Sequence, residues 1–159
     1  MQDRTGQSDR LARHSLTTSS ILAKAKIGLH IINTYMTRHR IYIKKYDWLI
    51  DFYLSARKDD VPVLLNELHN MGADDEALDD CACRLGCLNT GIAMSNPFSR
   101  HSLAVIAHAS DAAEYFDTFA HELNHVCSSI EKEYDIDPHS EEACYLLGDI
   151  VRSIIEEIL

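Results

Sequence analysis

Proline and glycine are scarce in this chain of 159 residues, which contains three prolines and six glycines. Because 46% of the residues are hydrophobic as well, we expect a packed globule rather than a disordered chain. Basic residues are also few: 15 lysines and arginines face 25 acidic residues, which gives a formal net charge of −10. This balance argues against a nucleic-acid groove, which needs a basic patch. The length fits one domain.

The N-terminal region lacks an apolar run long enough for a secretory signal or a membrane span. Residues 1–20 are polar, and residues 21–36 carry Lys24, Lys26 and His30 among their apolar positions. We therefore expect a cytoplasmic protein without a membrane partner. Association with a virion is the alternative if the gene belongs to a phage.

The cysteine count is odd, and no export signal accompanies it, so reduced thiols are favoured. Cys127 and Cys144 fall near apolar stripes and are expected to act as small core residues. Cys83 and Cys87 have the i, i+4 spacing that could share a soft metal ion. A closed structural zinc site usually takes four ligands, however, and no partner pair is evident. The role of Cys81, Cys83 and Cys87 stays open.

The most informative stretch is His-Glu-x-x-His at residues 121–125. On a helix, His121 and His125 lie on one face, so both imidazoles can reach one cation. Glu122 sits beside that face, where it can take a proton from a metal-bound water. Two nitrogen ligands, a general base and an open coordination position are the parts of a catalytic zinc site.

The residues around this motif predict a helix. Ser110-Asp111 provides an N-cap signal, and apolar residues follow at helical spacing. That expected core stripe is Ala112, Phe116, Phe119, Leu123, Cys127 and Ile130, and the expected polar stripe is Thr118, His121, Glu122, His125 and Ser129. A plain amphipathic helix would explain the stripes but not the choice of polar residues.

A third zinc ligand is expected downstream, because catalytic zinc sites take three protein ligands and water. A second helix is predicted there, capped by Asp137 or Ser140, with Pro138 at its first position if Asp137 is the cap. Its apolar stripe is Ala143, Leu146, Leu147, Ile150, Val151, Ile154, Ile155 and Ile158.

Glu141 and Glu142 stand at the start of this second helix. Tyr145 and Gly148 share the face of Glu141, and a glycine there would permit close approach to the first helix, so the geometry favours Glu141. Glu142, His139 or an aspartate are the alternatives. Acidic residues are also favoured in a first helical turn by the helix dipole alone.

Upstream, the pattern predicts a strand at Arg40–Tyr46 and helices at residues 61–71 and 74–88. The segment Trp48–Leu54 fits either a strand or a short helix. Residues 91–95 and 102–108 read as two strands joined by a turn at Asn96-Pro97. This order indicates an α+β domain with helices on one face of a short twisted sheet.

Five segments resemble small, single-domain metallopeptidase-like proteins of prophage and mobile-element gene clusters in gut Bacteroidales. The resemblance covers roughly residues 39–152, and its matching pieces are residues 41–47, 90–96, 105–106, 117–126 and 140–150. The last two are the specific ones. It implies a zincin-like fold of the minimal gluzincin type, with a glutamate on a second helix as the third ligand. One hairpin strand would border the cleft, and a peptide would add to the sheet edge there.

The resulting division is a flexible tail at residues 1–14, an N-terminal helical extension at 15–38 and a zincin-like domain at 39–159. In the first hypothesis His121, His125 and Glu141 hold Zn²⁺, and Glu122 is the general base of a metallopeptidase acting on a peptide or protein. Tyr145 or His139 would then donate a hydrogen bond to the transition state. The alternative is a noncatalytic structural or interaction protein, for example a phage particle component, that retains a metal site.

Overall fold

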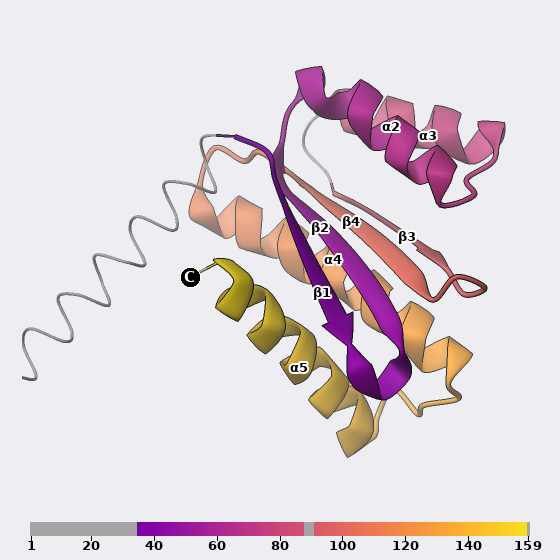
Figure 1. Ribbon diagram of the computed structural model, residues 1–159. Helices are drawn as coiled ribbons and strands as arrows, with labels where there is room; N and C mark the ends of the chain where they lie inside the picture. Colours follow the sequence, from indigo (N-terminus) through magenta and orange to yellow (C-terminus); the bar gives the residue numbers. More distant parts are fainter. Residues whose placement is uncertain (1–34, 88–90, 159) are drawn as a thin grey trace, which may run out of the picture.

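A four-stranded mixed sheet forms the middle layer of the protein (Figure 1). The computed structural model describes residues 35–87 and 91–158. The strands are β1 (Thr37–Ile43), β2 (Trp48–Ala56), β3 (Ile92–Asn96) and β4 (His101–Ala107), in the order β1-β2-β4-β3. The central pair β2 and β4 is parallel, and both outer pairings are antiparallel.

The expected hairpin is therefore confirmed as β3 and β4, and Trp48–Leu54 belongs to a strand. The expected strand at Arg40–Tyr46 is present, but it starts earlier and ends at Ile43, where a 3-10 turn at Lys44–Tyr46 follows. Because β1 begins at Thr37, it takes in the last two residues of the expected N-terminal extension. Residues 1–34, which contain the rest of that extension and the predicted tail, lie outside the described part of the chain.

Helices cover both faces of the sheet, so the expectation of helices on one face was wrong. On one face lie α2 (Val61–Asn70), entered through a 3-10 turn at Lys58–Asp60, and α3 (Asp75–Cys87). On the other lie α4 (Ala112–Glu133) and α5 (Glu141–Ile158) (Figure 1). The fold is α+β, as predicted.

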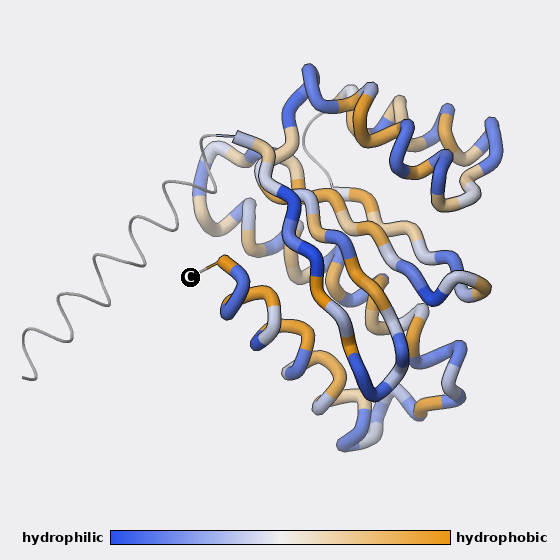
Figure 2. Tube along the Cα trace, viewed as in Figure 1, coloured by the Kyte–Doolittle hydropathy of each residue, from blue (hydrophilic) through white to orange (hydrophobic). Residues whose placement is uncertain are grey.

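The sequences of the central strands reflect burial on both faces, because apolar residues occupy successive positions in them (Figure 2). In β2, Ile50, Phe52 and Leu54 join the core cluster under α4 and α5, whereas Tyr53 joins the cluster under α2 and α3. Strands buried on both faces carry continuous hydrophobic runs. The apolar run of β4, in the segment predicted as a strand at residues 102–108, is of this kind, and β4 is a central strand.

Helix α4 begins as predicted at Asp111, whose carboxylate accepts hydrogen bonds from the backbone nitrogens of Ala113 and Glu114 at 2.8 and 2.9 Å. Its buried face differs from the expected stripe, because Phe116 is exposed. Phe119 packs against the core as expected, and the buried residues of the helix are Tyr115, Glu122, Leu123, Val126, Cys127 and Ile130. The core stripe is therefore rotated toward the side that carries Glu122.

Helix α5 starts at Glu141, and Ser140 rather than Asp137 caps it, since its Oγ accepts from the backbone nitrogen of Ala143 at 3.3 Å. Pro138 consequently precedes the helix. Cys127 is buried as expected, but Cys144 is exposed, which corrects its assignment as a core residue.

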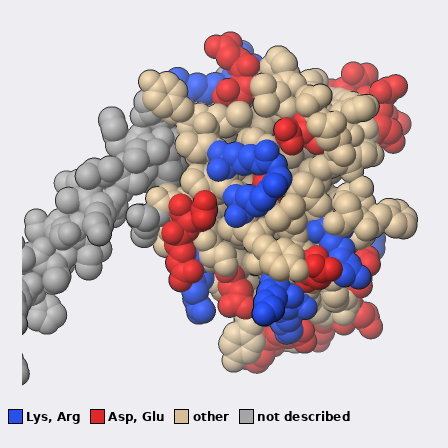
Figure 3. Space-filling view, viewed as in Figure 1, with Lys and Arg blue, Asp and Glu red and all other residues tan. Residues whose placement is uncertain are grey.

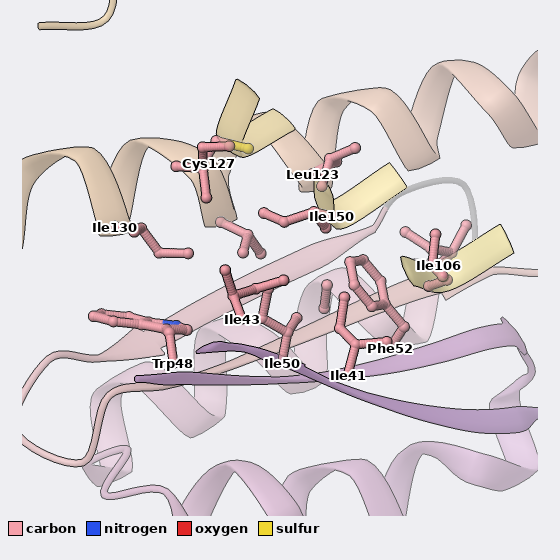
Figure 4. Packing of buried hydrophobic residues seen from close by; sticks show 14 of the residues in the cluster. Ile41, Ile43, Trp48, Ile50, Phe52, Ile106, Leu123, Cys127, Ile130 and Ile150 are labelled. Atoms are coloured by element: carbon pink, nitrogen blue, oxygen red, sulfur yellow. The ribbon is translucent and has the colours of Figure 1, made fainter. Parts of the chain in front are cut away.

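Helix α5 packs beside α4, and both contribute side chains to the core that lies between them and the sheet. Leu123 and Cys127 of α4 share one cluster with Ile150 of α5 and with Ile43 and Ile50 of the sheet (Figure 4). Helix α5 packs on β1, whereas α4 packs on β4 and β3. Within the described ranges, no helix is long and apolar enough to cross a lipid bilayer.

Candidate metal centre

The two histidines of the motif converge on the exposed flank of α4. Their Nε2 atoms lie 3.1 Å apart, and their ring centroids are separated by 4.7 Å. Both side chains are exposed to solvent. One turn of helix separates the two residues, and this spacing brings the rings together.

This geometry fits two nitrogen ligands of one zinc ion. Zn–N bonds of about 2.0–2.1 Å at a tetrahedral angle place two ligand nitrogens about 3.3 Å apart. The observed Nε2 separation is close to that value. A hydrogen bond between a protonated and an unprotonated imidazole gives a similar distance. The donor pair therefore suits the metal, although the distance by itself does not require one.

The Glu122 side chain points into the protein, whereas the two imidazoles beside it on the helix are exposed. Its side chain is 2% exposed, and its Oε2 has no hydrogen-bond partner among the described residues. Burial raises the pKa of Glu122, and the charges of His121, His125 and Arg84 oppose that rise. A buried carboxyl group with a spare oxygen beside two imidazoles is a strong candidate for proton transfer.

Glu122 is covered by the backbone at the entrance to β3. A Cβ atom built on Gly91 would lie 2.7 Å from Oε1 of Glu122 and 2.8 Å from its carboxyl carbon. From α3, Arg84 donates a hydrogen bond to the carbonyl oxygen of Gly91 at 3.4 Å. Sequence reasoning missed both residues. The available signal was the lone glycine before a strand, which often marks a close approach of another group.

The structure does not bring Glu141 to the histidine pair. Within the described part of the chain, no group of three or more His, Cys, Asp or Glu side chains is close enough together to hold a metal ion. Two of the three expected ligands are thus together and the third is apart from them. The reason for favouring Glu141 also fails, because a Cβ atom on Gly148 would meet nothing within 4 Å.

The position of α5 explains this separation. His125 and Cys127 are two residues apart, which is about 200° of rotation around a helix, so they occupy nearly opposite sides of α4. Cys127 belongs to the cluster shared with α5, while Glu122 abuts the start of β3. The histidines consequently lie on the flank of α4 that faces away from α5.

The alternative ligand Glu142 is engaged elsewhere. Its Oε1 accepts hydrogen bonds from Lys45 Nζ at 2.8 Å and from the hydroxyl of Tyr46 at 3.0 Å. These bonds lower the pKa of Glu142, with that from Lys45 the larger cause. The residue therefore fastens the start of α5 to the turn after β1.

The two expected transition-state donors are both exposed. Tyr145 is 67% exposed, one turn after Glu141 on the same flank of α5. His139 is exposed in the connection before α5, where its backbone nitrogen donates to Asp137 at 2.9 Å. Within the described ranges, no hydrogen bond or ring contact joins either side chain to the histidine pair.

A second buried carboxylate, Asp51 on β2, belongs to a different kind of cluster. Arg38 and Arg40 each donate two hydrogen bonds to it, at 2.8 to 3.1 Å, and His101 Nε2 lies 2.8 Å from its Oδ2. Burial acts to raise the pKa of Asp51, but the hydrogen bonds from His101, Arg40 and Arg38 hold it far below its ordinary value. Figure 3 shows basic side chains gathered over β1, in the middle of the visible face.

Comparisons with models of protein families, with curated proteins and with solved structures found no match.

Proposed function

We propose that the protein is a zinc-dependent metallopeptidase whose site is built on α4 and the start of β3. The observation that carries the proposal is the distance of 3.1 Å between the Nε2 atoms of His121 and His125. Glu122, which follows His121 in the chain, adds a buried carboxyl group with one oxygen that has no hydrogen-bond partner among the described residues. His121 and His125 would hold the zinc ion. When bound, zinc supplies a Lewis acid and a water of lowered pKa.

Glu122 is the proposed general base. Its burial favours the protonated form, and the neighbouring imidazoles and Arg84 favour the ionised form, so it is suited to accept a proton and to return it. Return of the proton to the leaving nitrogen would complete peptide hydrolysis.

Glu141, the residue predicted as third ligand, lies apart from the histidine pair, so its role as a ligand is tested separately from that of the base. Because Glu141 is apart from the histidine pair, Glu141→Gln decides whether α5 supplies a ligand in the loaded protein. A loss of zinc affinity of about tenfold or more would support ligation by Glu141. Glu142→Gln is the matched control, since Glu142 is occupied by Lys45 and Tyr46.

The sheet offers a place for an extended substrate, in keeping with a zincin-like arrangement. Strand β3 is at the edge of the four-stranded sheet, and α4 packs beneath it. An open strand edge can bind a peptide through backbone hydrogen bonds. On this ground we propose a peptide or protein substrate, in a protein that we expect in the cytoplasm or associated with a virion.

The experiment is a proteolysis profile of the zinc-loaded protein against a peptide library, compared with Glu122→Gln. We expect cleavage that a chelator abolishes and zinc restores, and a loss of at least about 100-fold in Glu122→Gln, since general base catalysis contributes about 10²–10⁴-fold. Glu122→Gln must still bind zinc. Unchanged cleavage in this variant would refute the assigned base.

A noncatalytic, metal-retaining structural or interaction protein is the second candidate. One observation favours it: only two candidate ligands meet within the described residues, where a catalytic zinc site takes three. Zinc binding without cleavage of any library peptide would support this second function.

A further inference from the structure

We propose that Gly91, at the entrance to β3, is a positioning residue that holds the carboxyl group of Glu122 in place. The space of the missing glycine side chain is filled by that carboxyl group. This inference rests on the role proposed for Glu122, but its geometric part can be tested independently of any activity.

The contact is steric and specific to one side chain. The three atoms nearest to a Cβ atom on Gly91 all belong to Glu122: Oε1 at 2.7 Å, the carboxyl carbon at 2.8 Å, and Cγ closer still. Separations under 3.0 Å force one of the two groups to move. Among the described glycines, positive φ occurs at Gly72 and not at Gly91, so an added methyl group would act through this contact rather than through backbone conformation.

The backbone at Gly91 is not free to retreat. Ile92, the next residue, is 2% exposed and pairs with Val105 of β4. The carbonyl oxygen of Gly91 also accepts the hydrogen bond from Arg84. The sheet and α3 thus both hold the chain at this point, and we expect a larger residue at position 91 to displace the Glu122 side chain rather than the backbone.

Displacement matters because no hydrogen bond among the described residues anchors the Oε2 atom of Glu122. Packing against Gly91 and the core therefore sets the position of the carboxyl group. A shift of about 1 Å in a catalytic group can cost about 100-fold in rate. The missing side chain at position 91 is therefore a requirement for the position of the base.

The geometric test is a double-mutant cycle in thermal unfolding, with Gly91→Ala, Glu122→Ala and the double variant. We expect Gly91→Ala to lower Tm by about 5 °C or more, and by no more than about 2 °C when residue 122 is alanine. Gly148→Ala is the control, because its added methyl group meets open space, and Tm should stay the same or rise. Should Gly91→Ala alone fail to fold, recovery of folding in the double variant carries the same information. An equal loss of Tm in both backgrounds would overturn the contact.

The functional test uses the zinc-loaded protein and the peptide that it cleaves best. Gly91→Ala should lower kcat by about 100-fold and leave KM within about threefold, with zinc still bound. If the natural protein cleaves peptides and Gly91→Ala keeps its kcat, the positioning role is wrong. If the natural protein cleaves nothing, the proposed function is lost, and the Tm cycle alone decides whether Gly91 positions Glu122.

Discussion

Two carboxylates are buried in this protein to nearly the same extent, and their surroundings are opposite. Asp51 is 1% exposed and Glu122 is 2% exposed. Asp51 is held by two arginines and His101, and its pKa is far below the ordinary value. Glu122 has an oxygen without a partner, and its pKa is raised by burial. Burial alone therefore says little about the role of an acidic residue.

The difference lies in what the fold provides for each charge. Strand β1 supplies Arg38 and Arg40 on the same side of the sheet as Asp51, since residues two apart on a strand share a face. This arrangement ties β1, β2 and β4 together and is structural. Among the described residues, the charges that act on Glu122 are those of the histidine pair and Arg84, and a buried group left incompletely paired is typical of a functional site.

Asp51→Asn is expected to have the largest effect on stability. The amide cannot accept from all of the present donors, so we expect a loss of about 2–3 kcal/mol in the free energy of unfolding. This is smaller than the loss of about 3–5 kcal/mol typical of breaking a fully buried ion pair, because both arginines are partly exposed. Urea unfolding measures it. A change below about 0.5 kcal/mol would show that the cluster is not structural.

Acid should remove the same contribution. Because the folded-state pKa of Asp51 is depressed, its stabilisation is fully present above the unfolded value of 3.8 and is lost as pH falls below it. The natural protein should lose more stability than Asp51→Asn between about pH 4 and pH 2. Parallel urea titrations across this range check the prediction, and identical slopes would contradict it.

Glu122→Gln should have a much smaller effect on stability than Asp51→Asn. The substitution breaks no hydrogen bond of Oε2 among the described residues, and it removes a charge that is costly to bury. We therefore expect the free energy of unfolding at neutral pH to change by no more than about 1 kcal/mol, in either direction. The same urea experiment measures it. A loss as large as that of Asp51→Asn would mean that Glu122 is a structural residue too.

The smallest effect is expected at Glu142, an exposed counterpart to both buried acids. Its ion pair with Lys45 lies at the surface, where ion pairs contribute little and are screened by salt, and glutamine keeps an oxygen that can accept from the partly buried hydroxyl of Tyr46. Glu142→Gln should leave Tm within the error of the measurement at 0.5 M NaCl. A clear loss of Tm at that salt concentration would show that this contact controls the docking of α5.

The sequence allowed much of this arrangement to be predicted. Hydrophobic periodicity, caps and turn residues predicted α2, α4 and the β3–β4 hairpin. The i, i+4 spacing of His121 and His125 predicted that their side chains lie together on one face of the helix. Such local features depend on neighbours in sequence. The cap at Asp111 likewise follows from short-range chemistry, whereas the sequence left Trp48–Leu54 open between a strand and a short helix, and the structure shows a strand.

What could not be predicted depends on contacts between distant residues. The flank of α4 that faces α5 is set by packing on β1 and β4, and this packing separates Glu141 from the histidines. The partners of Asp51 come from two other strands, β1 and β4, and Gly91 contacts Glu122 across more than thirty positions of sequence. No periodicity within one helix or strand carries such information.

Zinc titration of the natural protein, His121→Ala and His125→Ala tests the central claim most directly, with His69→Ala on α2 as the control. We predict one zinc ion per chain in the natural protein and in His69→Ala, and a loss of affinity of at least about 100-fold in each of the other two variants. Equal zinc affinity in all four proteins would contradict the assignment of His121 and His125 as metal ligands.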